Sequence, residues 1–150
     1  PRLASHDRVA TMIAILLAAA LAQSLPTPPV VLDAIGRQTL PQTGCAAYLW
    51  NASDRRLIAM ASADAATLRV SIGGRTFDLA RSAQDGATSL GLAAMTTYTG
   101  DGVTARLDMT VVPRENLVGG AQVSDGSLEI ARGGADSLIV PVAGLVGCTT

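Results

Sequence analysis

The clearest pattern of hydrophobic and polar positions lies in residues 103–111, VTARLDMTV. Its odd-numbered positions are apolar and its even-numbered positions are polar, which is typical of a strand with one buried and one wet face. Two-residue periods also run through 45–52, 57–61, 68–79 and 90–99, and return near the C-terminus at Leu128, Ile130, Leu138, Val140 and Val142. The pattern predicts β structure from Cys45 onward.

Short polar or glycine-containing segments separate these strands. Residues 53–56 form a polar turn, and residues 81–89, which are polar and contain Gly86, are expected to be a loop. Four dipeptides predict hairpin turns because glycine adopts positive φ and aspartate favours turns: Gly73-Gly74, Asp101-Gly102, Asp125-Gly126 and Gly133-Gly134. About eight or nine short antiparallel strands predict an all-β fold, a small sandwich or barrel.

The first 25 residues have the character of an export signal. Arg2 and Arg8 precede an uncharged stretch of 17 residues, 9–25, which as a helix would span about 25 Å, near the lower limit for crossing a bilayer. Its apolar side chains include Val9, Ile13, Leu16, Leu17 and Leu21.

Two interpretations of this segment stay open. Ala20-Leu21-Ala22 fits the small-x-small pattern of a signal peptide cleaved before Gln23. Alternatively, the segment is a signal-anchor helix that ends at Pro26, with its arginines and the N-terminus in the cytoplasm. We favour the anchor; in both cases the rest of the chain lies outside the cytoplasm.

Residues 26–44 are expected to be a proline-rich linker between the apolar segment and a β domain at 45–150. Pro26, Pro28 and Pro29 favour an extended polyproline conformation, which would hold the domain clear of a membrane surface. In the alternative arrangement, Val30, Val31, Leu32 and Ile35 lie across the domain or form a short turn of helix.

Cys45 and Cys148 bracket nearly the whole β domain, and neither lies in a CxxC or metal-ligand spacing. In an oxidising compartment such a pair predicts one disulfide that ties the first strand of the domain to the last. Two buried free thiols are the alternative.

Composition argues against nucleic acid as a partner. The formal net charge is -1, and the 11 cationic side chains, all arginines, are scattered along the chain. A basic groove would need them clustered. Stacking platforms are also scarce, since the aromatic residues are Tyr48, Trp50, Phe77 and Tyr98.

The sequence offers little chemistry for catalysis. The single histidine, His6, precedes the apolar segment, so the β domain cannot assemble a Ser-His or Cys-His nucleophile or a histidine-based zinc site. We therefore expect no enzyme activity, no cofactor and no metal. An enzyme that acts on glycans with aspartates and arginines only is an alternative, with Asp78, Asp101 and Asp108 as its candidates.

Five residues are candidates for contact with a partner. Tyr48 and Trp50 share one face of a strand, and exposed rings are frequent interface anchors; alternatively they cap the core. Arg114, Leu117 and Val118 belong to a segment that ends in two apolar residues before Gly119. Residues 143–147 are expected to be an edge strand held by the disulfide.

The layout of residues 67–148 is similar to that of periplasmic lysozyme-inhibitor domains, which are small β-barrels closed by a cysteine pair. The similarity lies in 68–79 around Gly73-Gly74, in 98–102 (YTGDG) and in the terminal cysteine. In those inhibitors a Ser-Gly pair precedes the tyrosine, whereas Ala94-Met95 stands here. The resemblance implies a barrel without the residues that enter a lysozyme active site.

Together these observations predict a non-catalytic domain on the periplasmic side of the inner membrane. Tethered by its N-terminal helix, it would be an accessory or structural subunit of a membrane protein complex. The alternative is a soluble periplasmic or secreted binding or inhibitor protein, released after Ala22.

Overall fold

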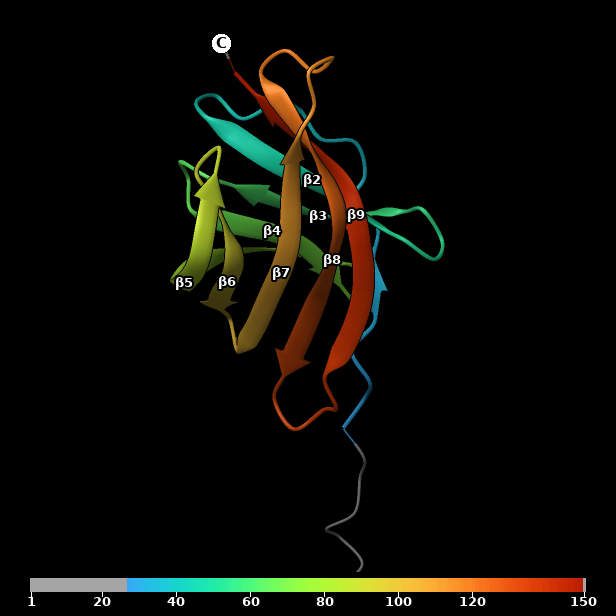
Figure 1. Ribbon diagram of the computed structural model, residues 1–150. Helices are drawn as coiled ribbons and strands as arrows, with labels where there is room; N and C mark the ends of the chain where they lie inside the picture. Colours follow the sequence, from blue (N-terminus) through green and yellow to red (C-terminus); the bar gives the residue numbers. More distant parts are fainter. Residues whose placement is uncertain (1–26, 150) are drawn as a thin grey trace, which may run out of the picture.

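The computed structural model describes residues 27–149, which form a closed antiparallel barrel of eight strands, β2 to β9, with one short additional strand, β1. Consecutive strands from β2 to β9 pair with each other, and the pairing of β9 with β2 closes the ring (Figure 1). The strands are β1 (Leu32–Asp33), β2 (Cys45–Asn51), β3 (Leu57–Ser62), β4 (Thr67–Ile72), β5 (Arg75–Ser89), β6 (Leu92–Gly100), β7 (Val103–Pro113), β8 (Gly120–Arg132) and β9 (Leu138–Cys148). The all-β prediction is confirmed, and the architecture is a barrel.

The barrel has two distinct ends. The proximal end carries the turns at 73–74, 101–102 and 133–137 together with residues 27–31, where the described chain begins (Figure 1). The distal end carries the β7–β8 loop, residues 114–119, and the C-terminal end of β9, which are joined by a hydrogen bond from Cys148 N to Gly119 O. Strand β9 runs from the proximal to the distal end.

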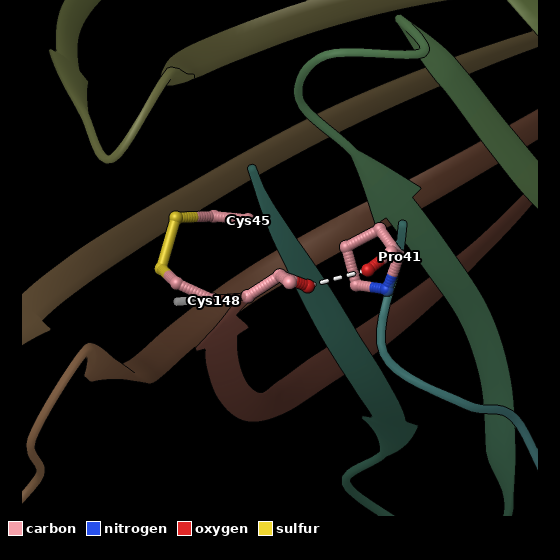
Figure 2. The surroundings of a disulfide bond; sticks show 4 residues. Pro41, Cys45 and Cys148 are labelled. Carbon is pink, nitrogen blue, oxygen red and sulfur yellow. Dashed lines mark hydrogen bonds between the residues drawn. A yellow bond between two sulfur atoms is a disulfide. The ribbon is translucent and has the colours of Figure 1, made fainter. Parts of the chain in front are cut away.

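The predicted disulfide is confirmed: Cys45 is bonded to Cys148 across 103 residues of chain (Figure 2). The two cysteines are register partners at the end of the β2–β9 ladder, so the bond joins strands that are already hydrogen-bonded. Beside it, the Thr149 hydroxyl donates to the carbonyl of Pro41. The disulfide therefore lies where the first and last long strands of the ring meet.

The core fills the barrel with inward-facing side chains from every strand of the ring. Fully buried examples come from β2, β3, β4, β5, β7 and β8, namely Leu49, Ile58, Leu68, Leu79, Leu107 and Leu128. The alternation recognised in 103–111 is confirmed: Val103, Ala105, Leu107 and Met109 are buried, whereas Thr104, Arg106 and Thr110 are exposed.

Residues 30–33 belong to the barrel. Val30 and Leu32 are buried in the core cluster, and Leu32–Asp33 pairs with Ile72–Ser71 of β4, beyond the end of β3. Of the arrangements predicted for the apolar residues after Pro29, the structure therefore has the one in which they lie across the domain. A boundary at residue 45 therefore falls too late, because the apolar residues after Pro29 find buried positions and backbone partners.

The loop predicted at 81–89 is wrong, because these residues form the second half of β5 and pair with β6. Residues 81–88 are all exposed, so this part of the hairpin lacks the apolar period that marks a half-buried strand. The β5–β6 ladder contains register shifts at Arg81/Ala83 and Asp85/Thr88, and Gly86 adopts a φ of 83°.

Among the predicted hairpin turns, those at 73–74, 101–102 and 133–134 are confirmed, but Asp125-Gly126 lies within β8. The β8–β9 register shifts between Val123 and Gly126, so this dipeptide makes a β-bulge. Bulges use the same residue types as turns, and local sequence does not separate them.

Residues 143–147 are not an edge strand, because β9 is paired on both sides, with β2 and with β8. Gly144 allows an unusually close approach to β2: a β-carbon there would lie 1.8 Å from the carbonyl oxygen of Tyr48. Because the ring is closed, β9 has no free edge.

Removal of the disulfide is expected to destabilise the barrel strongly. A cross-link that closes a loop of this length contributes about 4–5 kcal/mol in the chain-entropy model. Urea unfolding of Cys45→Ser/Cys148→Ser should show a loss of this order, and adding reductant should shift wild type but leave the double variant unchanged. Equal midpoints for oxidised and reduced wild type would contradict the structural role of the bond.

Gly144→Ala is expected to destabilise the protein by about 3 kcal/mol or more, because the new methyl group would overlap the backbone of β2. Gly134→Ala is the matched control, since a β-carbon at that position has only an ordinary contact, 3.5 Å from Thr27 Oγ1. Thermal unfolding of both variants measures the difference. Similar melting temperatures would show that β2 and β9 can separate at Gly144 without cost.

Candidate partner surface

Three adjacent strands of the barrel, β3, β2 and β9, contain no charged residue. Their inward positions fill the core, and their register aligns a second set of apolar side chains on the outside. We call this set the apolar outer face; its members are Leu57 and Met60 on β3, Tyr48 and Trp50 on β2, and Ile139, Pro141, Ala143 and Leu145 on β9. Ile139 and Leu145 are 64% and 48% exposed.

Tyr48 and Trp50, predicted to share a strand face, lie at the centre of the apolar outer face. Tyr48 stands between Met60 and Leu145 in the register, and Trp50 between Leu57 and Ala143. Between them Leu49 points inward and is fully buried. Both rings are half-buried on the outside of the barrel, so they are part of its surface and do not fill its interior.

Residues 38–43 cross the distal part of this face. The Tyr48 hydroxyl donates to Thr39 O at 2.8 Å, and Leu40 lies next to Gly147 of β9. Between this segment and β3–β4 runs an open groove of about 570 Å³, lined by Leu40 and Met60 and by polar groups that include Gln38, Asp64 and Arg69. Partial burial raises the pKa of Tyr48.

The groove is bordered by the bidentate ion pair of Arg69 and Asp78. Arg69 Nε and Nη2 donate to the two carboxylate oxygens of Asp78 at 2.8 and 3.0 Å, and Nη1 donates to Gln38 Oε1 at 2.9 Å. The hydrogen bonds from Arg69 hold the pKa of the Asp78 carboxyl below its usual range. This arginine thus fastens the crossing segment to the barrel wall.

The other predicted contact residues lie at the distal end, on the β7–β8 loop. Arg114 donates from Nε to Gln122 Oε1 at 2.7 Å, while Leu117 is 36% exposed and Val118 is fully exposed. The structure therefore places these three residues on a different element from Tyr48 and Trp50. Whether either set contacts a partner stays a prediction.

The aspartates named for the glycan-acting alternative lie beside three different arginines. Asp78 pairs with Arg69, Asp101 lies 4.0 Å from Arg75 in the proximal turn, and Asp108 lies 3.8 Å from Arg106 on β7. Within residues 27–149, no group of three or more side chains with metal-ligating chemistry gathers. Tyr98, which carries part of the resemblance to lysozyme inhibitors, is buried at 3% exposure.

The expected signal or anchor segment, with Val9, Ile13, Leu16, Leu17 and Leu21, lies outside the residues that the structure describes. In the part that is described, no helix has the length and apolar character needed to cross a bilayer. The choice between cleavage and anchoring stays a prediction.

The alternation at Leu138, Val140 and Val142 predicts only the inward side chains of β9, so it does not identify the outward residues of the apolar outer face. The segment LIVPVAGLVGC is apolar at both odd and even positions. Such a pattern indicates a strand covered on both sides, and it could have identified Ile139 and Leu145 as outward candidates. Leu40 carries no such signal, since its position depends on how residues 38–43 cross the barrel.

The chain matches no protein-family model, no curated protein and no solved structure.

Asp78→Asn is expected to lower the stability by up to about 1 kcal/mol at neutral pH, since both partners are half exposed and solvent screens the pair. Because the pKa of Asp78 is lower in the folded state, its contribution is complete above the unfolded-state value of about 3.9. It is lost as the pH falls through the folded-state value. Urea midpoints of wild type and variant should therefore converge in acid; a constant difference down to pH 2 would contradict this.

Proposed function

We propose that this protein is a non-catalytic extracytoplasmic β-barrel that serves as an accessory subunit of a membrane protein assembly. In this proposal residues 9–25 hold the barrel at the periplasmic side of the inner membrane, and the apolar outer face contacts the partner. The carrying observation is the uncharged outer surface over β3, β2 and β9, with Tyr48 and Trp50 at its centre.

This surface has the composition of an interface core. Interface cores are depleted in charge and enriched in aromatic residues and methionine, and Trp50, Tyr48 and Met60 stand in adjacent register positions here. The neighbouring outward positions of β8 are polar, including Gln122, Ser127 and Glu129. Such a polar border around an apolar centre is the usual arrangement of a docking site.

The disulfide supports an extracytoplasmic location. Structural disulfides persist in oxidising compartments such as the periplasm and are rare in the cytosol. The Cys45–Cys148 bond joins the two strands that complete the ring, which is a structural position. Together with the charge-flanked apolar run at 9–25, it favours a barrel exported through, or held at, the inner membrane.

The first test is an intact mass of the protein from its native membranes, combined with the size of the detergent-solubilised species. Retention of residues 1–22 and an apparent mass well above that of the 15.2 kDa chain are expected. A mass that begins at Gln23 would contradict the tether and favour the released binding protein. A lone monomer in mild detergent would contradict the subunit.

Leu145→Asp should return the assembled species to the monomer, because it buries a charge at the proposed contact. Thr104→Asp is the control: it adds the same charge at an exposed position on β7, two strands beyond β9. Size-exclusion chromatography of the two variants should give opposite results. Dissociation by both, or by neither, would argue against the apolar outer face as the docking site.

A further inference from the structure

The proximal end of the barrel lies very close to the apolar segment in sequence. Val30 is already buried in the core, Gly73 N donates to Val31 O at 3.1 Å, and Thr27 lies beside Gly134. Only residues 26–29 separate Leu25 from the barrel, and four residues reach at most about 14 Å. If residues 9–25 lie in a bilayer, as the proposed function holds, this end must face its surface.

Two arginines converge on one aromatic ring at this end. The guanidinium carbons of Arg75 and Arg132 lie 4.7 and 5.4 Å from the centroid of the Phe77 ring, which is itself buried. Both arginines occupy inward register positions at the mouth of the barrel, opposite Ile72 and Val103. The barrel therefore holds two cationic side chains against one ring at its opening.

The carboxylates near this pair leave it open to another anion. Asp101 Oδ2 is 4.0 Å from Arg75 Nη2, and both side chains are about two-thirds exposed, so this contact is weak. Asp33 Oδ2 accepts a hydrogen bond from Gly74 N at 2.7 Å. Among residues 27–149, no carboxylate lies within ion-pair distance of Arg132.

An apolar hollow of about 400 Å³ adjoins Arg132. Its walls are mainly apolar, and Val31 on its rim is 54% exposed. The residues that line it include Pro28, Pro29, Val30, Ile72 and Ala135. A hollow of this kind with a guanidinium in its wall matches an amphiphile that carries a negative head, because guanidinium forms strong, directional bonds with phosphate.

We propose that the proximal end of the barrel binds an anionic phospholipid of the membrane to which the chain is tethered. The phosphate is bound by Arg132 in the wall of the hollow, Arg75 adds a second positive charge at the same ring, and the glycerol with the first part of an acyl chain lies in the hollow beside Val31. This inference rests on the proposed function, which brings this end to the bilayer. Anionic headgroups attract cationic side chains at a membrane surface, and here Phe77 holds those side chains in place.

The test uses the full chain in micelles of an uncharged detergent, titrated with dihexanoyl phosphatidylglycerol. Amide signals of Gly73, Gly133 and Ala135 should shift in a saturable manner. Dihexanoyl phosphatidylcholine and inorganic phosphate should each bind at least about tenfold more weakly. Phosphatidylcholine lacks the net negative charge, and inorganic phosphate lacks the glycerol and the acyl chains. Equal binding of phosphatidylcholine would overturn the anion site, and equal binding of inorganic phosphate would overturn the lipid.

Arg75→Gln/Arg132→Gln should weaken phosphatidylglycerol binding by about tenfold or more. The control is Arg55→Gln/Arg81→Gln, which removes the same charge from exposed positions on the β2–β3 turn and in the second half of β5 and should bind as wild type does. If the first pair fails to fold, Val31→Asp, at an exposed rim position, should give the same loss by repulsion. Unchanged binding in a folded variant would overturn the site.

The result for lipid binding can be distinguished from the result for the membrane tether. A chain that begins at Gln23 in native material, yet discriminates between the two lipids, would contradict the tether and keep the lipid site. A retained N-terminal segment without discrimination would do the reverse.

Discussion

Closure of the ring is the constraint on which the rest of this structure depends. A single curved sheet of this length would expose backbone donors and acceptors along two edges, and only complete closure satisfies both. Closure here requires β2 and β9, more than 90 residues apart in the chain, to come together along seven register positions. Gly144 permits the close approach of the two backbones, and the disulfide holds the distal end of the ladder.

The apolar outer face lies along the ladder that closes the ring. Strands β2 and β9, which form this ladder, and β3 beside β2 contain no charged residue, whereas β4, β5, β7 and β8 all do. Segment 38–43 covers part of this surface and is fastened by Tyr48 and by Arg69. The uncovered part of the face is most exposed along β9, at Ile139, Pro141 and Leu145.

The sequence was informative wherever one face of a strand is buried and the other is wet. Residues 103–111 alternate cleanly, so strand and inward face could both be predicted, and the cysteine spacing predicted the disulfide. It was uninformative where pairing is local but burial is absent: residues 81–88 form a ladder with exposed side chains, and no period marks it. Arg75 and Arg132 are 57 positions apart, and only the contacts in the folded barrel show that they share the ring of Phe77.

If residues 9–25 anchor the barrel in a bilayer, the short spacing between Leu25 and Val30 limits how far the barrel can stand from the membrane surface. Strand β9 begins at the proximal end, and Leu145 stands six residues farther along it than Ile139, about 20 Å of strand. For a barrel anchored by residues 9–25, Ile139 would lie close to the headgroups and Leu145 well above them. A partner that covers this whole length must itself rise out of the membrane, so it would need a periplasmic domain or loop of comparable height.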